Sequence, residues 1–102
     1  MEILKSAYET LYVIDPSVGE EGVRALITKF NELISANGEI ESTNEWGNRR
    51  LAYPIRVGSR EVTDGYYVLV NYTSSHDFPA ELNRIFNITD GILRSLTTKV
   101  EK

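Results

Sequence analysis

Two segments of this chain alternate with a period of two and yet carry apolar side chains on both sides. They are residues 6–14 (SAYETLYVI) and residues 65–73 (GYYVLVNYT). Period-two alternation indicates β-strands, and β-branched and aromatic residues favour them. A strand that is apolar on both sides needs neighbours that cover it. We therefore expect both segments to be central strands of one sheet.

Two other segments show helical spacing. Apolar residues recur at i, i+3, i+4 and i+7 in the first, at Val23, Leu26, Ile27, Phe30, Leu33 and Ile34. Ser17 and Glu20 have the spacing of a capping box before it, and Asn37–Gly38 predict a left-handed stop after it. The second helix is predicted to start at Asp77 and Pro79, with Leu82, Ile85, Phe86 and Thr89 on one stripe.

Two further strands are predicted at the edges of the sheet. Residues 39–55 form a long strand with a bulge at Gly47, and Pro54 places it at an edge because proline cannot donate a ladder hydrogen bond. Residues 56–64 form a polar connection, and residues 92–100 form the last strand after the Asp90–Gly91 turn.

The element order is therefore strand, helix, strand, strand, helix, strand. With right-handed crossovers, this order gives an α+β, ferredoxin-like split βαβ sandwich, in which a four-stranded antiparallel sheet has both helices on one face. We expect one such domain over residues 1–102. The other face of the sheet has no helix over it, and Leu11, Val13, Tyr67 and Leu69 should lie there as an apolar surface.

Composition excludes several classes of protein. No apolar run approaches the roughly 20 residues of a membrane span, residues 1–6 are too short for a secretory signal, and there is no cysteine for a disulfide or a thiolate site. We therefore expect a cytoplasmic protein.

Positive charge is concentrated in one segment although the net charge is −4. Residues 46–60 contain four arginines and no acid, whereas the residues before and after them are acidic on balance. Residues 44–55 (NEWGNRRLAYPI), which overlap this segment and include Glu45 before it, form what we call the basic ribbon. A local cluster of this kind can contact phosphate, but it can equally keep an edge hairpin soluble.

No catalytic constellation is recognisable, so we predict a binding protein that is not an enzyme and needs no metal or cofactor. The only histidine, His76, is expected in an exposed turn without a partner for metal or nucleophilic chemistry. Neither GxGxxG nor GxxxxGK occurs, so a phosphate-binding loop for a small-molecule substrate is not indicated.

One alternative is an RNA-recognition-motif-like module that binds single-stranded RNA, since that module shares the predicted fold. Residues 10–16 (TLYVIDP) and 64–72 (DGYYVLVNY) superficially resemble its two strand motifs. The second motif departs from the pattern, because Asp64 takes the basic position and Tyr67 the position of a small residue.

A closer resemblance extends over almost the whole chain. Tyr8–Glu9, Asp15–Pro16, residues 45–55 (EWGNRRLAYPI), residues 65–67 and residues 88–94 (ITDGILR) together resemble the bacterial small-subunit ribosomal protein S-six (S6) family. The resemblance implies a ferredoxin-like fold and a structural role in the small ribosomal subunit, in its assembly and in translation. It also implies binding to the central domain of 16S-type ribosomal RNA together with ribosomal protein S-eighteen, as a heterodimer.

The resemblance further implies which residues take part. It places Arg49 and Arg50 near the protein partner, with Trp46 and Tyr53 offering apolar area to the same partner. It places Arg94 and Lys99 near the RNA backbone, although Arg94 could instead form an ion pair with Asp90.

The chain departs from the family before the Tyr–Glu pair. Family members commonly carry arginines there, whereas this chain has residues 2–7 (EILKSA) with Lys5 as the only cation. Lys5 is therefore the one candidate for an RNA contact at the N-terminus.

Overall fold

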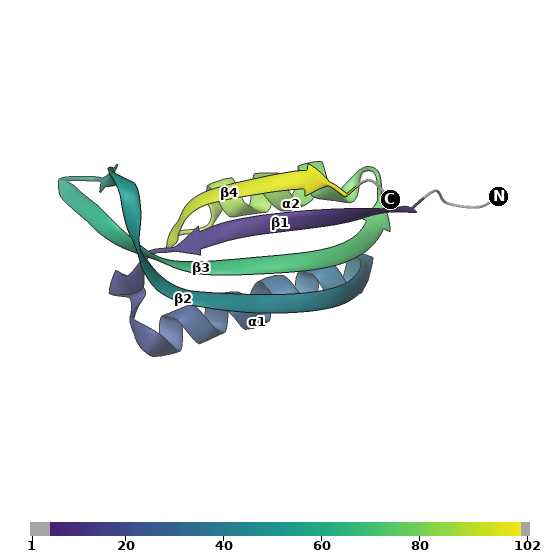
Figure 1. Ribbon diagram of the computed structural model, residues 1–102, viewed down its shortest axis with the longest axis horizontal. Coiled ribbons are helices and arrows are strands. Elements are labelled where there is room, and N and C mark those ends of the chain that lie inside the picture. Colours follow the sequence, from purple (N-terminus) through teal and green to yellow (C-terminus); the bar gives the residue numbers. More distant parts are fainter. Residues whose placement is uncertain (1–4, 101–102) are drawn as a thin grey trace.

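The computed structural model describes residues 5–100, which form a four-stranded sheet with two helices packed on one face (Figure 1). In chain order the elements are β1 (Lys5–Ile14), a 3-10 turn (Pro16–Val18), α1 (Gly19–Asn37), β2 (Gly38–Val57), β3 (Arg60–Ser75), α2 (Phe78–Ile88) and β4 (Ile92–Lys99). The strand order is β2-β3-β1-β4 and every pairing is antiparallel. The predicted ferredoxin-like fold is confirmed, with β1 and β3 central and β2 and β4 at the edges.

The core lies between the helices and one face of the sheet. Tyr12 of β1, Phe30 of α1 and Phe86 of α2 meet there, with ring centroids 4.4–5.4 Å apart. These tilted aromatic pairs bury large side chains in favourable geometry. The predicted stripe of α1 is confirmed, because Val23, Ile27, Phe30 and Ile34 are all buried. Neither helix of residues 5–100 is long and apolar enough to cross a membrane.

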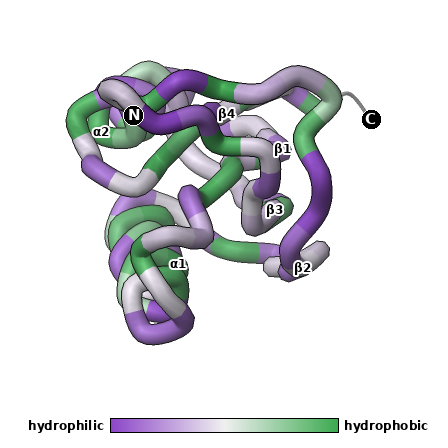
Figure 2. Tube along the Cα trace, turned by 90° about the vertical axis from the view of Figure 1, so that its left-hand side faces the viewer, coloured by the Kyte–Doolittle hydropathy of each residue, from purple (hydrophilic) through white to green (hydrophobic). Residues whose placement is uncertain are grey.

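The opposite face of the sheet carries no helix. Viewed from the end of the sheet, α1 and α2 lie on one side of the strands (Figure 2). Leu11 of β1 pairs directly with Leu69 of β3 and with Leu96 of β4, so all three side chains point away from the helices. We call this helix-free surface the open face.

Two predictions about the ends of α1 are wrong. Ser17 and Glu20 form no capping box; instead Asp15 Oδ1 accepts from the Ser17 backbone N–H at 3.0 Å and caps the 3-10 turn before the helix. Gly38 is also not left-handed, since its φ is −177°. A Cβ on Gly38 would lie 2.1 Å from the carbonyl oxygen of Thr73, so this glycine is needed because β3 approaches it closely.

The predicted polar connection at residues 56–64 is wrong as well. The strands continue through it, with Ile55 opposite Val62 and Val57 opposite Arg60, and only residues 58–59 form the turn. Gly58 has a φ of 63°, the left-handed conformation that a two-residue hairpin turn requires. The result is a long β2–β3 hairpin that extends beyond the rest of the sheet (Figure 1). It helps give the molecule a longest extent of 50 Å against 25 and 23 Å.

Candidate functional site

The open face is built of rows of residues that run across all four strands. Gly47 of β2, Tyr67 of β3, Val13 of β1 and Arg94 of β4 are aligned in register. The next row contains Leu69, Leu11 and Leu96, and the Leu96 side chain is 63% exposed. The open face is therefore apolar in the middle and carries a cation at the β4 edge.

Trp46, Tyr67 and Arg49 form an aromatic and cationic group at the β2 edge. The Trp46 and Tyr67 rings are stacked, with centroids 6.0 Å apart and planes 8° from parallel. The Arg49 guanidinium lies 5.3 Å from the centroid of the Trp46 ring, within the range of a cation–π interaction. Trp46 remains 42% exposed, so this ring is held in place while still able to contact another molecule.

A bulge in β2 turns Trp46 toward Tyr67. The register with β3 shifts between Glu45 and Gly47, and Gly47 has a φ of 85°. The predicted bulge at Gly47 is thus confirmed. Glu45 lies on the helix side, where its Oε1 accepts from the Tyr66 hydroxyl at 2.7 Å, and this bond to a carboxylate raises the pKa of Tyr66. Strand alternation therefore places Glu45 and Trp46 on opposite faces, and the bulge leaves Trp46 as the extra residue of β2 beside the Gly47–Tyr67 pair.

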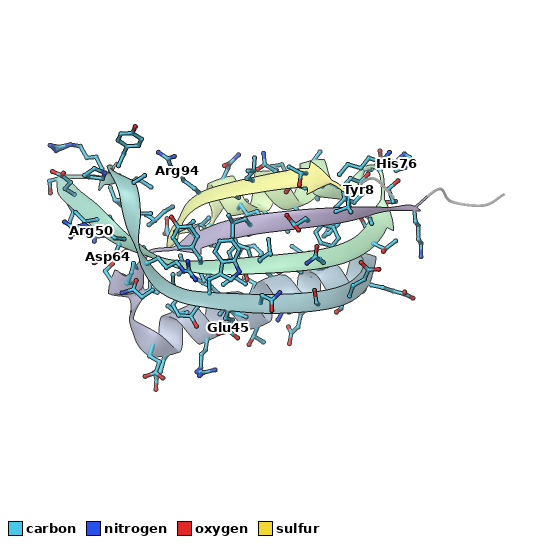
Figure 3. All side chains as sticks on the ribbon, viewed as in Figure 1. Tyr8, Glu45, Arg50, Asp64, His76 and Arg94 are labelled. Atoms are coloured by element: carbon cyan, nitrogen blue, oxygen red, sulfur yellow. The ribbon has the colours of Figure 1, made fainter. Side chains whose placement is uncertain are left out.

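The other residues predicted for the partner edge lie farther along β2. Arg50 pairs in register with Asp64 at the base of the hairpin (Figure 3). Strand alternation places its side chain on the other face from that of Arg49. Tyr53 lies within the irregular part of the hairpin and is 77% exposed. The basic ribbon therefore presents Trp46 and Arg49 on the open face, and Arg50 and Tyr53 elsewhere.

The three residues predicted to contact RNA do not form one cluster. Arg94 is on the open face opposite Val13, whereas Lys99 is opposite Tyr8 and points to the helix side of β4. The two positions are five residues apart along β4, or about 17 Å at the rise of an extended strand. Figure 3 shows Arg94 at the hairpin end of the molecule and Tyr8 near the other end. Lys5 is exposed at the start of β1, and residues 2–4 of the N-terminal segment lie outside the described residues.

Arg94 makes no ion pair with Asp90. Among residues 5–100 the ion pairs are Arg60 with Asp15 and Arg84 with Glu81. The guanidinium of Arg94 is exposed and is not bound by a carboxylate of the described chain. It is therefore available to an external anion.

The sequence did not reveal the ion pair between Asp15 and Arg60. Arg60 Nη2 lies 2.7 Å from Asp15 Oδ2, so this ion pair joins the start of β3, next to the hairpin turn, to the end of β1. Burial acts to raise the pKa of Asp15, but the hydrogen bonds from Arg60 and Ser17 outweigh it, so this pKa lies below its usual range. The pairing of Trp46 with Tyr67 was also missed, because strand alternation places a residue on a face without giving the register of the neighbouring strand.

His76 lies in the turn between β3 and α2, as predicted, and its side chain is exposed. Its Nε2 is 2.9 Å from the Ser6 hydroxyl oxygen. Within residues 5–100, no group of three histidine or carboxylate side chains could hold a metal ion.

Comparison with known proteins gives one consistent result. The family described as "Ribosomal protein S6" matches residues 7–99. Small ribosomal subunit protein bS6 of Clostridium perfringens strain 13 is 46% identical over 96 residues, which cover 93% of this chain and 97% of that relative. The bS6 protein of Caldanaerobacter subterraneus subsp. tengcongensis is 47% identical with the same coverage.

A solved structure supports the fold. The crystal structure of 30S ribosomal protein S6 from Thermotoga maritima superposes with a TM-score of 0.82, covering 95% of this chain and 89% of that one. The two sequences are 23% identical, so this likeness concerns the fold alone.

Proposed function

This chain belongs to the ribosomal protein S6 family of the small ribosomal subunit, and from that premise we propose that it binds the central domain of small-subunit ribosomal RNA together with ribosomal protein S-eighteen. As a member of that family it is a structural ribosomal protein and not an enzyme, and it is associated with the ribosome in the cytoplasm. The proposal concerns its partners and the surfaces that bind them.

The observation that carries the proposal is the arrangement of the open face. Arg49 and Arg94 stand on the two edge strands of the same sheet face, with Trp46, Tyr67 and Leu11 between them. Four strands place these edges about 14 Å apart at ordinary strand spacing. A protein that covers the apolar centre from the β2 side therefore ends beside Arg94.

The β2 side suits a protein partner better than RNA. Trp46 is a large, partly exposed aromatic ring with an arginine against it, the kind of side chain that dominates the energy of protein interfaces. β2 pairs only with β3, so its other edge has backbone groups with which an added strand could pair. We therefore assign Trp46, Arg49, Arg50 and Tyr53 to the protein partner.

The β4 side suits RNA. The guanidinium of Arg94 can hold a phosphate through two parallel hydrogen bonds. Lys99 and Lys5 add positive charge at the far end of the sheet. Few cations converge on any one surface, so we expect binding to RNA to be weak until the partner extends the surface next to Arg94.

Two sets of variants separate these assignments. We expect Arg49→Ala with Arg50→Ala to weaken capture of S-eighteen in a pulldown. We expect Arg94→Ala to leave that capture intact but to weaken RNA binding by the preformed pair. The slope of the logarithm of RNA affinity against the logarithm of salt concentration should become shallower by about one. Arg24→Gln, an exposed cation on α1, is the matched control and should change neither result. Undiminished capture of S-eighteen by the double variant would show that the basic ribbon does not form the partner edge.

A further inference from the structure

A groove lies on the helix side of β4, between that strand and α2. Its volume is about 420 Å³, within the range of small-ligand sites, and its lining extends around the β4 edge to Leu96 of the open face but does not include Arg94. Its lining residues include Tyr8, Pro79, Asn83, Ser95, Thr97 and Lys99. The groove thus contains Lys99, the predicted RNA contact that lies on the helix side of β4 and not on the open face.

The lining of the groove combines apolar and polar groups. Pro79 and the buried ring of Tyr8 give an apolar wall. One turn farther along α2, Asn83 Oδ1 accepts from the Ser95 hydroxyl of β4 at 3.1 Å. That bond occupies the oxygen of the Asn83 amide and orients its NH₂ group, which has no acceptor among the described residues and can donate to a ligand.

A chain of hydroxyl groups adds a second fixed donor. Thr97 Oγ1 lies 2.8 Å from Thr10 Oγ1, which lies 3.0 Å from the Tyr72 hydroxyl. Tyr72 and Thr10 are fully buried, so each hydroxyl hydrogen needs an acceptor inside the protein. Both are satisfied when Tyr72 donates to Thr10 and Thr10 donates to Thr97. The Thr97 hydroxyl then has its own hydrogen left for the groove.

The groove is therefore rich in donors and contains no carboxylate among its lining residues. Lys99, Asn83 and Thr97 offer an ammonium, an amide and a hydroxyl donor. Glu81 is the nearby acid on α2, and it is tied to Arg84 in an ion pair. Such a site favours a ligand that has many acceptors and negative charge, and that also has one flat apolar surface.

We infer that this groove binds one unpaired nucleotide of the RNA, with its phosphate on Lys99, its acceptors on Asn83 and Thr97, and its base against Pro79 and Tyr8. The inference rests on the proposed function, since it specifies a second RNA contact on the other side of β4 from Arg94. It assigns a binding role to Asn83 and Thr97, which belong to no motif recognisable in the sequence.

An NMR titration of the isotope-labelled full chain with a short oligouridylate tests the inference. We expect saturable shifts of the Asn83 side-chain amide and of the backbone amides of Ser95, Thr97 and Lys99. We expect Asn83→Leu and Lys99→Gln each to weaken this binding by about tenfold. Asn83 and Lys99 are both exposed, so neither variant should impair folding, and Arg24→Gln should bind like the unaltered chain.

Three results would overturn the inference. They are unmoved groove amides, equal shifts with inorganic phosphate alone, and shifts confined to Trp46 and Tyr67 on the open face. The last would favour the binding of single-stranded RNA to the sheet itself.

The same variants distinguish this inference from the proposed function. If Arg94→Ala weakens RNA binding by the preformed pair while oligouridylate leaves the groove unmoved, the inference fails and the proposed function stands. If oligouridylate binds the groove but Arg94→Ala has no effect on the pair, the groove stands and the assignment of Arg94 fails.

Discussion

At the scale of single residues, Asp15 links the end of β1 to Arg60, the first residue after the hairpin turn. Its side chain is only 7% exposed, and it accepts from both Arg60 and the Ser17 backbone. Removing the charge of this nearly buried carboxylate weakens both of its hydrogen bonds, while the half-exposed guanidinium of Arg60 regains water. The position of the hairpin therefore depends on one carboxylate.

We expect Asp15→Asn to lower the free energy of unfolding by about 1–3 kcal/mol at neutral pH. Because the pKa of Asp15 is lowered in the folded state, its contribution is complete above the ordinary aspartate range and is lost as the pH falls below about 4, toward that lowered pKa. Urea unfolding over this pH range should show a steeper loss of stability for the unaltered chain than for the variant. If the free energy of unfolding fell equally with pH in the unaltered chain and in Asp15→Asn, the ion pair would not contribute to stability. Glu81→Gln, which breaks an exposed pair, is the control and should leave the unfolding midpoint nearly unchanged.

The residue scale also shows what sequence reasoning can and cannot give. Tyr8, Tyr12 and Leu11 could be assigned to the correct faces of β1, because alternation in a strand is a local property. The ion pair between Asp15 and Arg60 joins residues that are 45 positions apart, and it exists because the hairpin returns to the end of β1. A contact of that kind depends on the three-dimensional path of the chain.

At the scale of elements, β2 determines how the open face is built. It is 20 residues long, and its register with β3 shifts at three places. Bulges at an edge bend the strand and hinder unwanted pairing, and one of them also re-aims a side chain, Trp46. The strand thus combines protection of an edge with presentation of Trp46, a partly exposed ring on the open face.

We expect Gly47→Ala to lower the free energy of unfolding by about 1 kcal/mol, since its φ of 85° is unfavourable for a residue with a Cβ. No atom lies within 4 Å of the added Cβ, so the cost comes from the backbone alone. If the added Cβ makes the backbone of the bulge relax, Trp46 moves off the Tyr67 ring, and the variant should therefore also capture less S-eighteen. Gly47→Asn is the matched variant, and it should cost less because asparagine tolerates the left-handed conformation better.

Equal stability of the two Gly47 variants would contradict this account of the bulge. Pulldown and chemical unfolding measured on the same samples would keep the two effects apart.

The elements themselves were largely predictable, but their ends were not. Pro54 and the two-sided apolar strands identified edge and central strands from local chemistry. The hairpin at residues 56–64 was missed because its residues are polar, although Gly58 provides the turn that continues both strands. Asp15 displaced Ser17 as the capping residue because it precedes Pro16 and starts a 3-10 turn ahead of the helix.

At the scale of the whole molecule, the proposed division of contacts between RNA and a protein partner explains how an acidic protein would bind RNA. The arginines of the hairpin and of β4 lie on the two edges of one sheet, while most acids lie elsewhere. The sequence could give the family and the cationic residues. It could not show that Arg94 and Lys99 lie on opposite sides of β4, because that depends on the pairing of β4 with β1.

The central claim is that RNA binding by this chain depends on the protein partner beside Arg94. A filter-binding titration of a central-domain fragment of small-subunit RNA, with and without S-eighteen, tests it most directly. We predict weak binding by the chain alone and an affinity at least about tenfold higher with the partner, a coupling in the ordinary range for two linked sites. Equally tight binding in the absence of S-eighteen would contradict the claim.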